Sequence, residues 1–111
     1  MMPSESCIFC KIVAKKIPSQ FIAETNDIVV IKDINPKASI HYLIIPKEHI
    51  VDVASINGQQ VDLAGQMLKM AGNLSQQLNN SSFKLVINNG SFQHVPHVHM
   101  HFLAGGRIDS V

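Results

Sequence analysis

Histidines are concentrated near the end of the chain in a regular pattern. His97, His99 and His101 alternate with apolar residues, which is typical of a strand with one polar and one apolar face. At a rise of about 3.3 Å per residue, the Cα atoms of the outer two histidines lie about 13 Å apart. That span is too long for one compact metal site, but it suits a row of imidazoles that serves two neighbouring sites.

Neutral imidazole is nucleophilic at cellular pH, so such a row can carry out covalent chemistry at phosphorus. One ring can attack the phosphorus of a phosphate ester or amidate to form a covalent adduct on histidine, which water then cleaves. Neighbouring rings can donate hydrogen bonds to phosphate oxygens or protonate the leaving group. A solvent-facing His-rich edge or a tag-like metal binder is the simpler alternative. The apolar residues Phe102 and Leu103 favour a core strand instead.

Other segments must position these histidines, and their patterns predict an α+β domain. Residues 7–16 are expected to form a short helix with Ser6 as its N-cap. A longer helix opens with a capping box at Asn57 and Gln60 and runs to about Leu78. The histidine segment is the last of five expected strands, and the others cover residues 21–24, 28–32, 41–46 and 83–87. We therefore predict one domain over residues 1–111, with a mostly antiparallel five-stranded sheet and two helices on one face.

The longer helix has an apolar stripe with helical spacing that should face the core. The stripe consists of Val61, Ala64, Leu68, Ala71, Leu74 and Leu78. Met67 and Met70 flank it and are interpreted as core residues. Gly65 and Gly72 favour close packing at this helix, including a contact between subunits.

Composition points away from several classes of protein. The formal net charge is +1 in 111 residues, and no basic run is longer than Lys15-Lys16, so we expect no partner among nucleic acids or membranes. The N-terminus has no signal-peptide pattern, and no apolar run approaches the roughly 20 residues of a membrane span. We expect a cytoplasmic protein, in which Cys7 and Cys10 do not form a structural disulfide.

Residues 97–103, with the sequence His-Val-His-Met-His-Phe-Leu, resemble the signature of the histidine triad (HIT) superfamily at all seven positions. That signature is His-φ-His-φ-His-φ-φ, where φ is apolar. The chain is also similar to the histidine triad nucleotide-binding (Hint) branch, of the bacterial zinc-site type. The similarity covers, in order, residues 7–12, 17–18, 33–36, 41, 45–50 and 88–90. It implies a HIT-like fold, a homodimer, and hydrolysis of purine nucleoside 5′-phosphoramidates or related nucleotidyl compounds.

The resemblance also implies catalytic and nucleotide-binding residues. His99 would be the nucleophile, His101 would contact phosphate, and His41 would support the site from an adjacent strand. Asp33 corresponds to an acidic residue that binds the ribose hydroxyls, a role that suits an acceptor-only carboxylate. Taken alone, His41 reads as a core histidine and Asp33 as a turn residue. The remaining nucleotide contacts implied are the apolar clamp around the base and two polar residues: Ile8, Phe9, Ile12, Ile31, Ile34, Asn88 and Gln93.

A structural zinc ion is the cofactor that the resemblance implies. A Cys-x-x-Cys pair by itself is compatible with redox activity, metal binding or inert packing. In bacterial-type members the two cysteines join two histidines, and the matching set here is Cys7, Cys10, His49 and His97. Two thiolates and two imidazoles form a closed tetrahedral set, which suits a structural ion.

The segment before the triad departs from the family pattern. Residues 91–96 are about two residues shorter than usual, and His94 stands where a small hydroxyl often contacts the phosphate. His94 either replaces that contact with a bulkier donor or faces solvent, so leaving-group preference stays open.

Three other functions are compatible with the same residues. A non-catalytic nucleotide-binding or interaction protein would bind nucleotide without forming an adduct on His99. A dinucleoside polyphosphate hydrolase or nucleotidyltransferase would use the same residues on another substrate. A metal-dependent hydrolase or metal carrier, with His97 and His99 sharing one ion, would lose its activity to a chelator while still folded.

Overall fold

The computed structural model describes residues 6–106 and residue 108. Its five strands form one sheet in the order β1-β2-β3-β5-β4, and all neighbouring strands are antiparallel. The strands are β1 (Phe21–Glu24), β2 (Ile28–Lys32), β3 (Ile40–Pro46), β4 (Phe83–Ile87) and β5 (Met100–Ala104). The predicted α+β domain with a five-stranded antiparallel sheet is confirmed.

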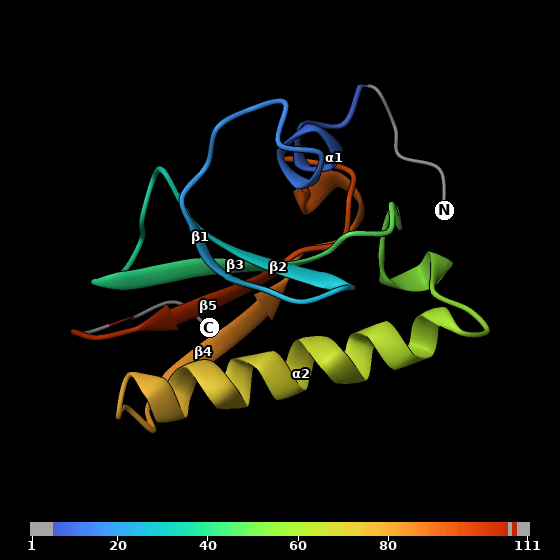
Figure 1. Cartoon of the computed structure of the whole chain (residues 1–111). Coiled ribbons are helices and arrows are strands. Elements are labelled where there is room, and N and C mark those ends of the chain that lie inside the picture. Colours follow the sequence, from blue (N-terminus) through green and yellow to red (C-terminus); the bar gives the residue numbers. More distant parts are fainter. Residues whose placement is uncertain (1–5, 107, 109–111) are drawn as a thin grey trace.

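The two helices cover opposite faces of this sheet. Helix α1 (Ile8–Val13) lies above it and α2 (Gln60–Gln77) below it in Figure 1. Val30 and Ile44 face the α2 side, whereas Val29 and Ile45 belong to the cluster under α1. The prediction that both helices share one face is therefore wrong. The central strands are apolar on both faces, and each face needs a cover.

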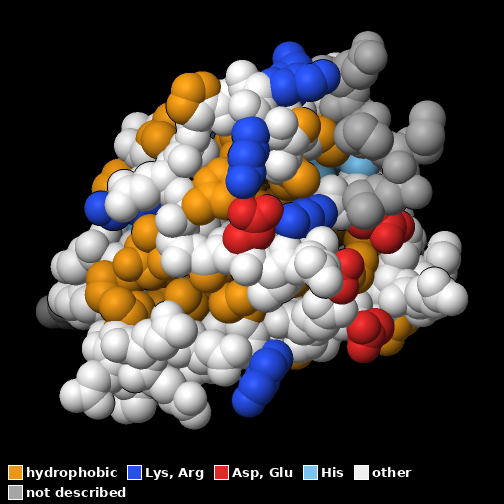
Figure 2. Space-filling view, viewed as in Figure 1, with side chains coloured by type: hydrophobic (Ala, Val, Ile, Leu, Met, Phe, Trp, Pro, Cys, Tyr) orange, Lys and Arg blue, Asp and Glu red, His pale blue; other side chains and the backbone are white. Residues whose placement is uncertain are grey.

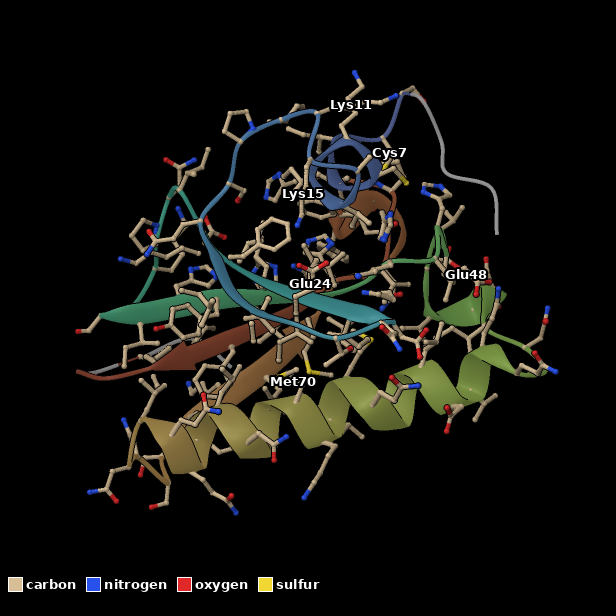
Figure 3. All side chains as sticks on the ribbon, viewed as in Figure 1. Cys7, Lys11, Lys15, Glu24, Glu48 and Met70 are labelled. Atoms are coloured by element: carbon tan, nitrogen blue, oxygen red, sulfur yellow. The ribbon has the colours of Figure 1, made fainter. Side chains whose placement is uncertain are left out.

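Helix α2 packs on the sheet through a stripe that matches the predicted one only in part, since Ala71 and Leu74 are buried as predicted. Val61 and Leu68 of the predicted stripe are 60% and 57% exposed. Hydrophobic side chains fill the space between the sheet and α2 (Figure 2), and Met70 points from the helix towards the sheet (Figure 3). The buried residues of α2 are Leu63, Met67, Ala71 and Leu74, so the prediction of a core role for Met67 is confirmed.

Neither described helix is long and apolar enough to cross a membrane.

Both helices start at residues that differ from the predicted ones. Cys7, not Ser6, is the N-cap of α1, and its Sγ accepts a hydrogen bond from the backbone N–H of Cys10 at 3.4 Å. Helix α1 ends at Val13, and Lys15 beyond it has a left-handed φ of 61°. Helix α2 begins at Gln60, whose Oε1 accepts from the backbone N–H of Asn57, so half of the predicted capping box forms.

The histidine segment is extended before it becomes a regular strand. Strand β5 begins at Met100, and the backbone N–H of Val98 donates to the carbonyl of Ile50 at 2.7 Å. Val98, Met100 and Phe102 belong to the core on the α2 side. The alternating histidines therefore face α1, as the pattern predicts.

Candidate active site and metal centre

The row of histidines lies beneath α1, where it meets an aromatic side chain of that helix. Phe9 contacts His97 and His99 edge-on, with ring centroids 5.8 and 4.9 Å apart. His41 in β3 lies diagonally across from His101 in β5, since Leu43 is the register partner of His101. Their ring centroids are 5.1 Å apart. One face of the sheet thus carries two adjoining clusters of side chains.

The first cluster, which we call the metal cluster, consists of Cys7, Cys10, His49 and His97. Their ligand atoms all lie within 4.8 Å of one another. Nδ1 of His97 is 3.3 Å from Sγ of Cys7 and 3.1 Å from Nδ1 of His49, and Sγ of Cys10 is 3.3 Å from Nδ1 of His49. Metal–ligand bonds of about 2.0–2.3 Å place tetrahedral ligands about 3.3–3.8 Å apart. The four side chains therefore could hold a metal ion with little adjustment.

Backbone contacts hold the ligands of the metal cluster in the form that binds a metal. Nε2 of His97 donates to the carbonyl of Pro46 at 2.8 Å, so its Nδ1 presents a lone pair to the cysteines. Burial, with smaller contributions from the charges of His49 and His99, lowers the pKa of His97 to about 4. Cys7 and Cys10 are both buried, and neither is in a disulfide in the described part of the chain. Neutral imidazole and thiolate are the ligand forms that a metal site requires, and reduced cysteines supply the thiolate when they lose their protons.

The hydrogen bond of His99 assigns its tautomer. Nδ1 of His99 donates to the carbonyl of His97 at 2.7 Å, which leaves a lone pair on Nε2. Burial lowers the pKa of His99 below its ordinary value, so the ring is neutral at neutral pH. A buried neutral imidazole with a fixed lone pair is suited to nucleophilic attack.

A chain of hydrogen bonds gives His101 the opposite tautomer to that of His99, with its proton on Nε2. The backbone N–H of Lys37 donates to Nδ1 of His41 at 3.0 Å, so the proton of His41 is on Nε2. That Nε2 donates to Nδ1 of His101 at 2.8 Å, which places the proton of His101 on its own Nε2. Nε2 of His101 is buried and has no hydrogen-bond partner among the described residues. His101 therefore presents an N–H beside the lone pair of His99.

Asp33 adds a negative charge to this second cluster, which we call the imidazole cluster: Asp33, His41, His99 and His101. Its Oδ2 lies 3.3 Å from Nε2 of His41, and its Oδ1 accepts from the backbone N–H of Asn35 at 2.7 Å. Burial is the main cause that lowers the pKa of His41, and Asp33 opposes it. Burial and the charges of His99 and His41 lower the pKa of His101 to about 4. All three rings are therefore neutral at neutral pH.

The chain matches known proteins over nearly its whole length. A family model described as "Scavenger mRNA decapping enzyme C-term binding" matches residues 6–107. The protein HitA of Neisseria gonorrhoeae is 38% identical over 102 residues, which cover 89% of this chain and 95% of HitA. The purine nucleoside phosphoramidase of Escherichia coli K12 is 31% identical over 106 residues, covering 92% of this chain and 89% of the enzyme. The chain belongs to the histidine triad (HIT) family.

Solved structures of HIT proteins share the fold. A HIT family hydrolase from Legionella pneumophila has a TM-score of 0.88 at 37% identity, covering 92% of this chain and 95% of its own. A zinc-bound histidine triad family protein from Mycobacterium smegmatis has a TM-score of 0.78 at 30% identity, covering 94% of this chain and 78% of its own. The predicted resemblance to the HIT superfamily is therefore confirmed.

The HIT fold distributes the predicted nucleotide contacts unevenly around the imidazole cluster. Phe9, Ile12 and Ile31 are buried beneath α1, whereas Ile8 and Ile34 are 45% and 91% exposed. Three of the five apolar residues are therefore buried, and two are exposed. Two polar residues complete the predicted set: Asn88 is half-buried just after β4, and Gln93 donates from Nε2 to the carbonyl of Val51 at 2.7 Å.

Three groups that set the chemistry of this HIT site were missing from the sequence analysis. They are the carbonyls of Pro46 and His97 and the backbone N–H of Lys37. Every residue type except proline carries both of these backbone groups, so no side-chain pattern marks them. The bend of the chain after β2 brings the N–H of Lys37 to His41, and the position of the histidine segment beside the end of β3 brings His97 to the carbonyl of Pro46.

Proposed function

We propose that this HIT protein is a hydrolase that cleaves purine nucleoside 5′-phosphoramidates through a nucleotidyl intermediate on His99. The observation that carries the proposal is the pair of ring nitrogens with opposite roles. Nε2 of His99 offers a lone pair, and Nε2 of His101 offers a proton that no described residue accepts. The E. coli relative, a purine nucleoside phosphoramidase, supports the substrate class.

The reaction follows from these two nitrogens. Nε2 of His99 attacks phosphorus, and a P–N bond to the ring forms as the bond to the leaving amine breaks. Nε2–H of His101 donates to a non-bridging phosphate oxygen, where negative charge develops. Water then attacks the nucleotidyl-histidine, releases the nucleoside monophosphate and returns the electron pair to His99. His41 keeps His101 in the donating tautomer throughout.

Zinc is the proposed cofactor of the metal cluster, with Cys7, Cys10, His49 and His97 as its ligands. The thiolate and imidazole donors suit this ion, and the zinc-bound relative from M. smegmatis supports the choice. A closed set of four protein ligands supplies structural cross-linking and no chemistry at phosphorus. It would tie α1 to the chain around His49 and to the histidine whose carbonyl orients His99.

Nucleotide binding is proposed to use the residues beside the imidazole cluster. Asp33 would bind the ribose hydroxyls, and Asn88 and Gln93 would contact the ribose and phosphate. The base would pack between α1 and the exposed Ile34. The apolar side of that site is formed by Ile8, Phe9, Ile12, Ile31 and Ile34.

We further propose that the protein is a cytoplasmic homodimer. Val61 and Leu68 are seven residues apart on one face of α2, and both are exposed. A Cβ built on Gly65, between them, would meet nothing within 4 Å, so a second chain could approach closely there. The reduced cysteine pair is compatible with the cytoplasm.

Hydrolysis of adenosine 5′-phosphoramidate by the wild type and by His99→Ala tests the proposed reaction. The wild type should turn the substrate over, and the variant should lose at least about 10⁴-fold in kcat because the nucleophile is absent. Wild-type protein denatured with alkali during turnover should carry adenylate on His99, seen by mass spectrometry, since the P–N bond of the adduct is labile in acid. Circular dichroism of the variant checks that it is folded.

Each alternative function predicts a different result in the same assay. Nucleotide binding by folded wild type without turnover or adduct would leave a non-catalytic binding protein. Faster turnover of a diadenosine polyphosphate would favour the dinucleoside hydrolase. Activity lost to a chelator without unfolding would favour a metal-dependent hydrolase. That last reading has little support, because His99 is in neither metal-capable group of the described residues.

A further inference from the structure

The proton on Nε2 of His41 has two acceptors within reach. It is donated to Nδ1 of His101 at 2.8 Å, and Oδ2 of Asp33 lies 3.3 Å from the same nitrogen. The ligand atoms of these three side chains all lie within 4.8 Å of one another. A neutral imidazole carries one N–H, and the backbone N–H of Lys37 already occupies Nδ1 of His41. His101 and Asp33 therefore compete for one proton.

The backbone around Asp33 fixes the carboxylate in this position. Its own N–H donates to the carbonyl of His41 at 3.0 Å, so the two residues lie side by side. The backbone N–H of Asn35 donates to Oδ1 of Asp33 at 2.7 Å, and the other oxygen, Oδ2, faces His41. The side chain of His41 is 3% exposed, whereas that of Asp33 is 17% exposed. The carboxylate therefore contacts a buried ring while part of it remains in contact with solvent.

A charged acceptor beside an N–H weakens the hydrogen bond that the N–H makes to another group. Hydrogen bonds to an ionised acceptor are about twice as strong as those between neutral groups. Hydroxyl groups that donate to Asp33 would satisfy its lone pairs and reduce its attraction for the proton of His41. That proton would then be donated to His101 alone. A firmer hydrogen bond at Nδ1 of His101 keeps the proton of this ring on Nε2, where no described residue accepts it.

We propose that Asp33 is a positioning residue that couples binding of the ribose hydroxyls to the donating form of His101, an inference that rests on the proposed nucleotide binding. In the free protein, the carboxylate attracts the proton of His41 and weakens the hydrogen bond from His41 to His101. The 2′- and 3′-hydroxyls of a ribonucleotide occupy the carboxylate, and the N–H of His101 is then held towards the phosphate. A substrate without these hydroxyls meets a pair of rings whose hydrogen bond is still weakened. Selection for ribose therefore acts on the chemical step as well as on binding.

Adenosine and 2′,3′-dideoxyadenosine test this coupling without any substitution in the protein. Neither nucleoside has a phosphate, so neither reacts, and they differ only in the two hydroxyls. In protein labelled with nitrogen-15, the NMR coupling between Nε2 of His41 and Nδ1 of His101 across their hydrogen bond reports the strength of that bond. Saturating adenosine should increase this coupling, and saturating dideoxyadenosine should leave it unchanged. A shift of the Ile34 amide signal with each nucleoside checks that both are bound.

Asp33→Asn removes the competing charge with little change in shape. Its Oδ1 can still accept from Asn35, and the Nδ2 placed beside His41 cannot accept a proton. The free variant should therefore already show the larger coupling, and adenosine should not increase it further. In single-turnover assays at saturation, the wild type should cleave 2′,3′-dideoxyadenosine 5′-phosphoramidate about 10-fold more slowly than the ribose compound, which is part of the about 10²–10³-fold effect of a full donor. In Asp33→Asn the two rates should agree within about twofold.

A matched variant and the pattern of responses separate the possible outcomes. Asp62→Asn makes the same change of charge at an exposed position of α2, on the other face of the sheet, and should leave the NMR coupling and both rates unchanged. Equal responses to the two nucleosides, or a response to adenosine that persists in Asp33→Asn, would overturn the role of Asp33 while leaving the nucleotidyl-histidine intact. A raised KM with an unchanged rate at saturation for the dideoxy substrate would likewise confine Asp33 to binding.

Failure of the proposed function would look different. If folded wild type cleaves neither substrate but adenosine still increases the NMR coupling, the hydrolase proposal fails and the coupling through Asp33 stands. If adenosine does not bind to the folded wild type, the proposed nucleotide site fails, and the coupling fails with it.

Discussion

The metal cluster and the imidazole cluster use the same side chain in opposite ways. In the metal cluster, His49 and His97 turn their Nδ1 atoms towards each other and towards two sulfurs, and the atoms converge on one point. In the imidazole cluster, His99 and His101 turn one nitrogen each into a hydrogen bond and leave the other nitrogen open. The first arrangement suits an ion that stays in place. The second leaves a lone pair and a proton for a substrate.

This difference arises from backbone groups, because the ring is the same in each case. The carbonyl of Pro46 takes the Nε2 proton of His97, whereas the carbonyl of His97 takes the Nδ1 proton of His99. Histidines two residues apart on one face therefore present different nitrogens. His97 connects the two clusters, because its ring is one of the metal ligands and its carbonyl accepts a hydrogen bond from Nδ1 of His99. The proposed structural ion and the proposed catalysis are thus linked at one residue.

The largest effect on stability should come from removing one ligand of the metal cluster while the imidazole cluster is left intact. Cys7→Ser keeps an oxygen that can cap α1, as the sulfur now does, but removes a thiolate ligand. At free zinc near 1,000 times its Kd, bound metal stabilises the fold by about 4 kcal/mol, and the variant should lose that increment. Urea unfolding with zinc and with a chelator measures it. His99→Ala should respond to zinc like the wild type, and stoichiometric zinc on Cys7→Ser would contradict the ligand assignment.

A substitution in the imidazole cluster should instead lower the reaction rate, by a factor that corresponds to a similar free energy. His101→Ala removes the N–H proposed to stabilise the phosphate charge, and one such donor is worth about 10²–10³-fold in kcat. The zinc content and the response of unfolding to a chelator should stay those of the wild type. Steady-state kinetics on adenosine 5′-phosphoramidate measure the loss. A raised KM with unchanged kcat would instead mean that His101 stabilises the bound ground state and the transition state equally.

The comparison also shows which features could be predicted from the sequence. Alternation alone predicted that His97, His99 and His101 share one face. Side-chain periodicity determines this feature, because it depends on the direction of the Cβ atoms. The HIT resemblance then connected those residues to His41 and His49, which no local pattern joins.

Features that depend on tertiary packing or backbone position were predicted less well. The central strands are apolar on both faces, and a single run of apolar residues does not reveal which helix covers which face. Val61 and Leu68 were assigned to the core although they are exposed, because their spacing is as helical as that of the true stripe. The tautomers of His99 and His101 depend on backbone groups of distant or neighbouring residues, and periodicity carries no information about these.

Acidification should cause a smaller loss of folding stability, through the protonation of His101. In the unfolded chain a histidine gains its proton near pH 6.5, whereas burial, with the charges of His99 and His41, lowers the pKa of His101 to about 4. Between these values the unfolded state binds more protons, so His101 contributes stability above pH 6.5 that is lost as the pH falls towards 4. Protonation of Nδ1 would also break the hydrogen bond from His41.

Nitrogen NMR of the imidazole rings can follow this step directly. The Nδ1 signal of His101 should titrate near pH 4. The fall in unfolding free energy from pH 7 to pH 5 should be smaller in His101→Asn than in the wild type, since asparagine does not titrate. Comparing the two proteins cancels the acid sensitivity of the metal cluster, which is common to both. A midpoint at or above pH 6.5 for His101 would mean that its ring is hydrated rather than buried. The two clusters would then differ in their contacts but not in their protection from solvent.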